Sequence, residues 1–460
     1  MPFVSVNPAT GRRLRSWPAH RPAEVERRVT KAAAAARQWR EASLPRRAAH
    51  LRAIARALRA RSRALADLIV AEMGKPLGQA RAEIEKCALT CEFYAKHGPR
   101  FLSPQRPEGA PPNAEVRFEP LGTVLAVMPW NFPVWQALRA ATPAIMAGNA
   151  FLLKHAPNVT GCALAVESLL AAAARDRRGP APAGLLQALL VEPPAVARLL
   201  ADPRVHAVTL TGSTRAGRSV AAAAGAAMKK GVFELGGSDA YVVLEDADLD
   251  RAAEICAGSR LINSGQSCVC AKRFIVVEKV RREFEGKFAA RLAARRMGDP
   301  RDPATDVGPL ARRDLREHLD AQVRASVRAG ARLVFGGRPA PGPGWFYPPT
   351  LLTGVRPGMP AYAEELFGPV AAVIAARDEA HALALANDSA YGLGAAVFTR
   401  SRRRGEAAAA RLDAGVVCIN DFVRSDAALP FGGVKQSGHG RELGAFGLRE
   451  FVNIKTVWTG

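Results

Sequence analysis

Residues 121–133 read LGTVLAVMPWNFP, and this stretch decides the fold of the chain. Leu121–Met128 is a largely apolar run with the length of one buried strand, and the turn after it leads into a helical pattern at 134–146. Further strands are predicted at 150–154, 184–190 and 205–210, with helices at 158–175 and before the last strand. Short strands that alternate with helices predict an open parallel sheet with right-handed crossovers.

The rest of the chain adds a helical region before this sheet and a second α/β series after it. Residues 22–97 carry amphipathic helical spacing that Pro45 and Pro76 interrupt, and the proline-rich residues 101–113 are typical of a connector. The second series has a predicted helix at 279–296 and predicted strands at 241–244, 274–277, 331–335, 395–398 and 416–419. We therefore expect two α/β domains, whose junction is a common place for an active site.

Bulk composition is that of an ordinary globular protein. The 460 residues are 48% hydrophobic and 23% charged, and the chain is long enough for two or three domains. Because no run of 18 apolar residues occurs, we expect no helix that spans a membrane and no membrane partner. The start of the chain lacks the basic-then-apolar layout of a signal peptide, so the predicted location is the cytoplasm.

The net charge of +23 and the seven cysteines suggest two further classes of partner. Arginines are spread along an alanine-rich chain without interleaved aromatics or a reader motif, so compositional bias is the better interpretation and no nucleic-acid partner is expected. The cysteines form no Cys-x-x-Cys pair, and Cys87 and Cys91 have no further His or Cys nearby to complete a zinc set. We expect reduced thiols and no metal site.

Two segments supply the groups that covalent catalysis needs. Residues 263–270 read NSGQSCVC and offer Cys268 as a thiol nucleophile, while residues 233–237 read FELGG and offer Glu234 as a carboxylate base. Between two prolines, Asn131 is a rigid amide donor that can stabilise an oxyanion, although an asparagine that satisfies its own turn is the alternative.

Gly212-Ser-Thr-Arg-Ala-Gly217-Arg218-Ser219 follows a predicted strand and opens a helix. Backbone N–H groups at such a helix start can hold a phosphate, and a plain capped helix is the alternative. The string is one residue from a P-loop, but Arg218 stands where that motif needs lysine, which disfavours a nucleotide triphosphatase. The chain contains no Gly-x-Gly-x-x-Gly, so the ordinary dinucleotide fingerprint is absent.

Taken together, these segments resemble the aldehyde dehydrogenase superfamily over nearly the whole chain. The motifs that carry the resemblance are Asn7–Gly11, Pro129–Pro133, Lys154, Thr211–Ser213, Glu234–Gly237, Gly265–Cys268, Glu364–Val370, Asn387, Tyr391–Leu393 and Pro430–Gly438. The resemblance implies an α/β aldehyde dehydrogenase fold in three parts. These are a variant Rossmann cofactor domain at 1–101 and 121–235, an α/β catalytic domain at 236–436, and a small β oligomerisation arm at 102–120 and 437–460. It also implies a homodimer or homotetramer.

The resemblance further implies a mechanism. Cys268 attacks the aldehyde to give a thiohemiacetal, Asn131 and the Cys268 backbone N–H hold the oxyanion, and Glu234 activates the water that hydrolyses the later thioester. The implied cofactor is NAD or NADP. The residues that the resemblance assigns to its binding are Trp130, Lys154, Pro157, Gly212, Ser213, Leu235, Glu365 and Phe367. Pro157 stands where many NAD-preferring members carry the glutamate that binds the 2′-hydroxyl, so we expect NADP to be accepted.

Within the superfamily, the chain looks most like the bacterial succinate-semialdehyde dehydrogenases. The resemblance implies that Arg139 and Ser425 bind the substrate carboxylate, with a structural ion pair as the alternative for Arg139. A further arginine of some members is replaced here by Ile262. A broad medium-chain or aromatic aldehyde dehydrogenase is the alternative enzyme, and a non-catalytic binding protein is disfavoured because Cys268, Glu234 and Asn131 are all present. Cys270 is either a redox partner of Cys268 or a small apolar filler.

Overall fold

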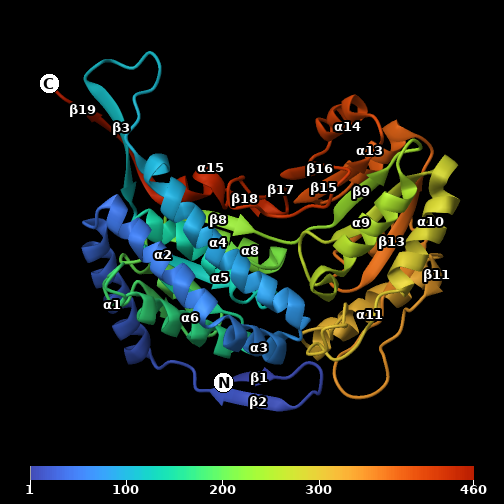
Figure 1. Ribbon diagram of the computed structural model, residues 1–460, viewed down its shortest axis with the longest axis horizontal. Coiled ribbons are helices and arrows are strands. Elements are labelled where there is room, and N and C mark those ends of the chain that lie inside the picture. Colours follow the sequence, from blue (N-terminus) through green and yellow to red (C-terminus); the bar gives the residue numbers. More distant parts are fainter. Residues whose placement is uncertain (1) are drawn as a thin grey trace.

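Two predominantly parallel sheets, one in each of two lobes, form the frame of the protein (Figure 1). The computed structural model describes residues 2–460. The six-stranded sheet of the first lobe has the order β18-β8-β7-β4-β5-β6, and the seven-stranded sheet of the second has the order β11-β12-β13-β10-β9-β15-β16. Only the edge strands β18 and β11 pair antiparallel with their neighbours. The α/β class predicted from the alternating pattern is confirmed.

The first lobe is built mainly from the N-terminal half of the chain. Its strands are β4 Thr123–Met128, β5 Ala150–His155, β6 Leu186–Ala188, β7 Ala207–Thr211, β8 Lys230–Glu234 and β18 Gly438–His439. Its helices are α1 Pro22–Arg40, α2 Leu44–Ala60, α3 Ser62–Met73, α4 Leu77–Leu102, α5 Trp135–Met146, α6 Thr160–Ala173, α7 Ala195–Ala201, α8 Thr214–Ala226 and α15 Gly444–Arg449, with the 3-10 helix η1 at Pro157–Val159.

The helical region predicted at 22–97 becomes four helices because local signals end each one. Pro45 lies in the first turn of α2, where its missing N–H costs nothing, and Ser43 caps that helix. Gly74 ends α3 with a left-handed φ of 80°. The longest helix, α4, then runs beside α5, which packs on β4 and β5. One flank of α4 thereby comes to lie near the carboxyl edge of the first sheet.

The second lobe contains the rest of the α/β pattern. Its strands are β9 Asp239–Val243, β10 Ala271–Val277, β11 Arg332–Phe335, β12 Thr350–Thr353, β13 Val370–Ala376, β14 Tyr391–Gly392, β15 Gly394–Phe398, β16 Val416–Ile419 and β17 Val434–Lys435. Its helices are α9 Leu249–Leu261, α10 Glu278–Ala293, α11 Arg313–Arg328, α12 Pro360–Ala363, α13 Glu379–Asn387 and α14 Arg402–Ala409, with the 3-10 helix η2 at Ile262–Gly265.

The prediction omitted two adjacent interior strands of this sheet, β12 and β13. β13 pairs with β10 on one side and β12 on the other, and its residues are buried except for Ala375. Four of its seven residues are alanine, which has a low strand propensity, so local composition hides the strand. The tertiary setting overrides that preference because both faces of the strand are covered.

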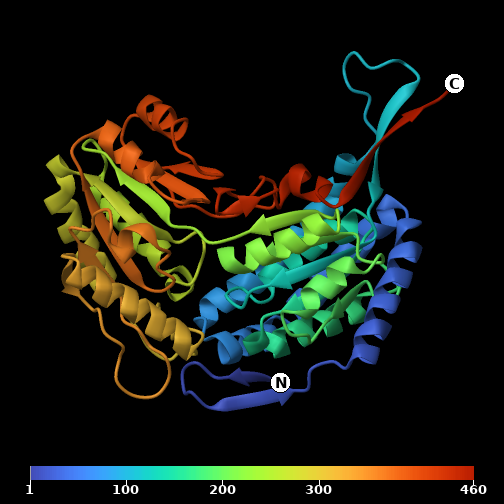
Figure 2. The same ribbon diagram turned by 180° about the vertical axis from the view of Figure 1, so that it is seen from behind.

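A two-stranded ribbon projects from the first lobe and carries the C-terminus (Figure 2). It consists of β3 Ala114–Pro120 and β19 Val452–Trp458, paired antiparallel with Lys455 opposite Arg117. Ile454 and Trp458 of this ribbon are exposed. A second hairpin, of β1 Phe3–Val6 and β2 Arg13–Trp17, lies at the opposite end of the first lobe (Figure 1). Among residues 2–460, no helix is long and apolar enough to cross a membrane.

Candidate active site

A cavity of about 370 Å³ at the junction of the lobes contains the predicted nucleophile. Cys268 lines it, and so do Arg139 on α5 and Ser425 on the loop after β16. Its remaining walls come mostly from aromatic and aliphatic side chains. These are Phe132, Trp135, Ile262, Val269, Phe422, Val423 and Phe431. Arg139 and Ser425 are 286 positions apart in the sequence. The structure nevertheless brings both of them and the Cys268 thiol into one largely apolar cavity.

The nucleophile lies on a loop with an unusual backbone. Asn263, Ser264 and Gly265 have left-handed φ values of 54°, 57° and 76°. A side chain at Gly265 would be impossible, since a Cβ there would lie 2.3 Å from the carbonyl carbon of Gly368. Left-handed conformations at non-glycine residues persist only where the surroundings impose them, and they gather at functional sites. Here the η2 turn places the loop that carries Cys268 at the junction of the two lobes.

Asn131 and Asn263 tie this loop to the end of β4. The Asn131 side-chain Nδ2 donates to the Gln266 carbonyl at 3.1 Å, two residues before Cys268. Asn263 Nδ2 donates to the Asn131 backbone carbonyl at 2.7 Å and to the Gln266 carbonyl at 3.0 Å. The Asn131 amide is thus directed at the nucleophile loop rather than satisfied within its own turn. Sequence reasoning missed Asn263 as the residue that positions it.

Lys272 is a second residue that the sequence did not reveal. It lies on β10 and is buried, and its Nζ donates to the Cys268 carbonyl at 2.8 Å and to the Ser267 carbonyl at 3.1 Å. The same Nζ lies 3.5 Å from Glu365 Oε1, which in turn accepts from the Gly237 backbone N–H at 3.0 Å. One lysine therefore links the nucleophile loop to the segment that follows Glu234. The available signal was a pair of cations, Lys272 and Arg273, at the start of an otherwise apolar strand.

Burial favours the protonated forms of both reacting groups. Desolvation raises the pKa of the Cys268 thiol to about 12, and the cations Arg139 and Lys272 oppose only part of that shift. Glu234 is 1% exposed, and neither carboxyl oxygen has a hydrogen-bond partner among residues 2–460. Burial, and next the nearby Glu442, raises the pKa of Glu234 well above its usual range. A thiol in this state needs a base, and a carboxyl in this state can become one as the pH rises.

The segment Pro430–Gly438 closes over Glu234 from the second lobe. A Cβ on Gly432 would lie 2.8 Å from Glu234 Oε1, so glycine allows this approach. Gly438 pairs with Glu234 in the β18–β8 ladder. Glu442, just beyond this segment, forms a buried ion pair with Arg139, whose Nη2 also donates to Thr211 Oγ1 at 3.2 Å. Arg139 thus lines the substrate cavity and also forms a buried ion pair with Glu442. Sequence reasoning missed Glu442.

A separate cleft of about 380 Å³ lies beside the end of β5 and the start of α8. It is lined by Val127, Lys154, Pro193, Pro194, Val196, Ala197, Ala216, Ser219, Val220 and Ala223. At Gly212, just before α8, only Leu210 lies within 4 Å of the Cβ position, so the backbone is open. Open backbone at a helix N-terminus, with Ser213 as the cap and a lysine on the facing strand, fits the phosphates of a dinucleotide.

Several residues predicted to bind the nicotinamide end of the cofactor make close contacts. Trp130 and Phe367 form an edge-to-face pair with ring centroids 5.7 Å apart. Leu235 packs so tightly against Gly217 that a Cβ there would lie 2.4 Å from a Leu235 methyl group. A Cβ on Gly236 would likewise lie 2.7 Å from Glu365 Oε2. These are local contacts between pairs of residues, and the binding of a cofactor by them stays a prediction.

His155, which follows Lys154 in the sequence, is not available to bind a 2′-phosphate. It is buried, its Nε2 donates to the Pro133 carbonyl at 2.8 Å, and its Nδ1 accepts from the Ala156 N–H. Burial lowers the pKa of His155 to about 4, so the ring is neutral near pH 7. Lys154 is left as the cation at the end of β5. Pro157 begins η1 and is exposed, with no carboxylate at that position.

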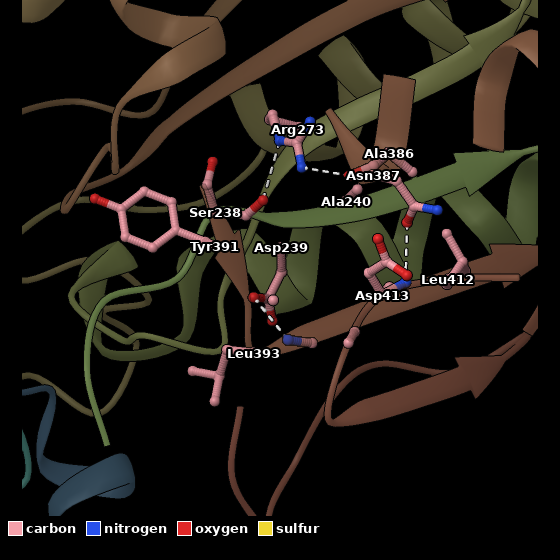
Figure 3. Close-up of a pocket in the computed structure, with 14 residues that line it drawn as sticks. Ser238, Asp239, Ala240, Arg273, Ala386, Asn387, Tyr391, Leu393, Leu412 and Asp413 are labelled. Atoms are coloured by element: carbon pink, nitrogen blue, oxygen red, sulfur yellow. Dashed lines mark hydrogen bonds between the residues drawn. The ribbon is translucent and has the colours of Figure 1, made fainter. Parts of the chain in front are cut away.

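A small polar cluster surrounds Ser238 and Asp239 at the start of β9 (Figure 3). Arg273 donates to the Ser238 carbonyl at 3.0 Å and to two carbonyls at the end of α13, at 2.8 and 2.9 Å. Asp239 accepts from the Gly394 N–H at 3.1 Å, and burial raises its pKa to about 7. These contacts join β9, β10, α13 and β15 of the second lobe where the segment that follows Glu234 enters β9.

Cys270 and the other thiols are free in the structure. Cys270 is fully buried, and its thiol donates to the Ile262 carbonyl at 3.3 Å. It does not line the substrate cavity, whereas Cys268 does. A redox link between the two therefore stays a prediction. No cluster of metal ligands occurs within residues 2–460.

This geometry has counterparts among known proteins. The model of the aldehyde dehydrogenase family matches residues 2–457. The chain belongs to the aldehyde dehydrogenase family. It is 49% identical to the succinate semialdehyde dehydrogenase [NAD(P)+] Sad of Escherichia coli, over 99% of this chain and 97% of that protein. It is 46% identical to the succinate-semialdehyde dehydrogenase [NADP(+)] 1 of Mycobacterium tuberculosis, over the full length of both.

A solved structure shares the same fold as this aldehyde dehydrogenase. The succinic semialdehyde dehydrogenase of Streptococcus pyogenes, in complex with NADP+ as the cofactor, superimposes with a TM-score of 0.95. The two are 34% identical, and the match covers 99% of each chain. The fold expected from the resemblance in sequence is confirmed.

Proposed function

We propose that the protein oxidises succinate semialdehyde to succinate with NAD or NADP as the oxidant. The observation that carries this proposal is the single cavity in which the Cys268 thiol shares its walls with cationic side chains and Ser425. An aldehyde that reaches Cys268 with an anionic far end would find both apolar walls and positive charge. The full-length similarity to succinate-semialdehyde dehydrogenases supports the same substrate.

The chain's own residues would carry the chemistry in two stages. Glu234, in its ionised form, takes the thiol proton, directly or through a water, and Cys268 attacks the aldehyde carbon to form a thiohemiacetal. The Asn131 amide and the Cys268 backbone N–H stabilise the oxyanion. After oxidation, Cys268 carries a thioester. Glu234 has by then released the thiol proton to solvent, and it takes a proton from the water that attacks the thioester. Succinate leaves and the thiol is restored.

The dinucleotide supplies a hydride acceptor when it is bound. Its phosphates would rest on the N-terminus of α8 at Gly212 and Ser213, and Lys154 and Glu365 would hold ribose hydroxyls. Trp130, Phe367 and Leu235 would line the nicotinamide. The open helix start and the 380 Å³ cleft support this placement.

The proposal is tested by initial rates of reduced-nicotinamide formation. Succinate semialdehyde, glutarate semialdehyde, hexanal and benzaldehyde are each compared with NAD and with NADP. We expect the highest kcat/KM for succinate semialdehyde. If hexanal or benzaldehyde leads, the family and mechanism stand, and the enzyme is instead a broad medium-chain or aromatic aldehyde dehydrogenase.

Replacing Pro157 by glutamate is expected to shift the cofactor preference towards NAD. The position is exposed, so the new side chain can be accommodated, and its charge would repel a 2′-phosphate beside Lys154. Truncating or opposing one charge-assisted contact costs about 1.5–3 kcal/mol, which is a fall of about 10- to 150-fold in kcat/KM for NADP. The ratio of kcat/KM for NADP to that for NAD measures this, with Pro157→Ala as the control. An unchanged ratio in Pro157→Glu would refute the placement of the ribose.

Replacing Arg139 by alanine is expected to raise KM for succinate semialdehyde by about 10- to 100-fold and to leave KM for hexanal nearly unchanged. The guanidinium lines the cavity, so its loss removes a cation that faces the substrate carboxylate. The same change leaves Glu442 buried without its ion-pair partner, so kcat should fall for both aldehydes. Equal changes in KM for the two substrates would show that Arg139 acts only through Glu442.

We further propose that the enzyme is a homodimer or homotetramer that works in a reducing compartment, the cytoplasm. Support for assembly comes from the projecting β3–β19 ribbon, whose edges and exposed Ile454 and Trp458 are suited to pairing with a neighbour. Support for the location comes from the seven cysteines, all of them free.

A further inference from the structure

Lys86 places a cation in the substrate cavity, and no carboxylate of residues 2–460 forms an ion pair with it, although Asp426 and Glu83 act on its charge from a distance. Its Nζ donates to Ser425 Oγ at 2.7 Å and to the Ser425 carbonyl at 2.9 Å, and both acceptors are uncharged. The same Nζ lies 4.5 Å from the centroid of the Trp135 ring, a cation–π contact. An ammonium group has three N–H donors, so one remains for a ligand.

The other charged groups around the cavity already have partners. Glu83, three residues before Lys86 on α4, forms a buried ion pair with Lys75 and accepts from the backbone N–H groups of Val134 and Trp135, each at 2.9 Å. Arg139 is paired with Glu442. Arg424, which also lines the cavity, is paired with Asp421. Within the described part of the chain, Lys86 therefore has no ion-pair partner, and Asp426 and Glu83 offset its charge only in part.

The position of Lys86 on its helix explains how it reaches the cavity. Gln79, Ala82, Glu83 and Lys86 all line the cavity, and their spacing of i, i+3, i+4 and i+7 places them on one stripe of α4. Across the cavity, Ile262 contributes an apolar side chain at the position where the family resemblance implied a further arginine. Lys86 supplies positive charge from a different element.

An unpaired ammonium among aromatic side chains is costly for the protein alone. Burial, and next the repulsion from Arg139, lowers the pKa of Lys86 to about 8. An anion bound beside Nζ would reverse that cost, because an opposite charge within a few ångströms favours the protonated amine. A half-buried cation without an ion-pair partner, in a cavity that also contains the nucleophile, is thus suited to an anionic group of the substrate.

We propose that Lys86, together with the Ser425 hydroxyl, binds the distal carboxylate of the aldehyde substrate and so selects aldehydes that carry an anionic far end. This proposal rests on the proposed function and assigns its selectivity to a residue on α4. Arg139 contributes less to carboxylate binding than Lys86, since Glu442 already offsets its charge. Lys86 binds the substrate carboxylate, whereas Cys268 reacts with the aldehyde carbon.

The test compares Lys86→Met, which keeps the length and volume of the side chain and removes its charge, with the wild-type enzyme. Kinetics are measured with succinate semialdehyde and with butanal, which has the same four-carbon chain without the carboxylate. Lys96→Met makes the same change at an exposed position of the same helix and serves as the control. We expect kcat/KM for succinate semialdehyde to fall about 100-fold in Lys86→Met, mainly through KM, and kcat/KM for butanal to stay within about threefold.

Two further measurements separate a binding role from a structural one. Lys86→Arg keeps the charge and should retain the preference for succinate semialdehyde over butanal. Calorimetric titration with succinate, without turnover, should show weaker binding to Lys86→Met than to the wild-type enzyme, whereas butyrate should bind both alike. Equal losses for both aldehydes, or unchanged succinate binding in Lys86→Met, would overturn the proposal.

The outcomes also separate this proposal from the proposed function. If the wild-type enzyme prefers succinate semialdehyde and Lys86→Met keeps that preference, the substrate assignment stands and the role of Lys86 is wrong. If the wild-type enzyme itself prefers butanal, the substrate assignment fails, and the role of Lys86 fails with it.

Discussion

Replacing Cys268 by alanine is expected to reduce turnover of every aldehyde by at least about 10⁴-fold, because no other thiol lines the cavity and covalent attack has no substitute. The measurement is steady-state formation of reduced nicotinamide. Binding of NADPH, followed by its fluorescence, should be unaffected, which shows that the variant is folded. The natural control is Cys270→Ala, which changes a buried cysteine outside the cavity two residues away.

That control also bears on the redox prediction. Cys270→Ala should retain most of its activity, whether Cys270 is a filler or a redox partner. If peroxide inactivates both this variant and the wild-type enzyme in a way that dithiothreitol reverses, the proposed Cys268–Cys270 link is excluded. Turnover by Cys268→Ala above about one hundredth of the wild-type rate would remove Cys268 from the nucleophile's role altogether.

Replacing Glu234 by glutamine is expected to give the second-largest effect, and a characteristic one. General base catalysis contributes about 10²–10⁴-fold, so steady-state turnover should fall by that factor. If an outside base or water can still remove the thiol proton slowly, reduced nicotinamide should appear first in a burst of about one equivalent per active site and then slowly. Rapid-mixing absorbance measures both phases. A variant with normal steady-state turnover would contradict the assignment of the base.

The pH dependence of the same step follows from the environment of Glu234. Burial raises its pKa, so the carboxyl stays protonated to a higher pH than an exposed glutamate, and the basic form appears only as the pH rises through that raised value. The wild-type rate of thioester hydrolysis should therefore increase with pH across this range. Glutamine does not titrate, so the Glu234→Gln rate should lack that increase. A parallel rise in both enzymes would assign the pH dependence to another group.

Much of the fold was predictable because its signals are local. The apolar run before Pro129 and the proline turns define β4 and the start of α5 within a few residues of the observed bounds. Pro45 and Gly74 mark helix ends through their own backbone preferences. β13 could not be found in this way, because an alanine-rich strand depends on burial by its neighbours rather than on its own propensity.

The residues of the candidate site likewise fall into those that the sequence revealed and those that only the structure revealed. Cys268, Glu234 and Asn131 were identifiable because each lies in a short motif whose glycines or prolines indicate a special backbone. Glu442 and Lys272 carry no such motif. Their relevance comes from partners far along the chain or across the sheet, such as Arg139 for Glu442, and only packing reveals which of many charged residues is buried beside the reacting groups.

The amino-acid sequence by itself determined the α/β alternation, the nucleophile, the base and the family, since these depend on local backbone preferences and short motifs. Only the tertiary structure decided which charges are neutralised. Lys86 and Ser425 are 339 residues apart, yet they share a hydrogen bond in the substrate cavity, while Glu83 beside Lys86 on the same helix is committed to Lys75. Electrostatic pairing depends on distance and burial in space, which the order of residues along the chain does not specify.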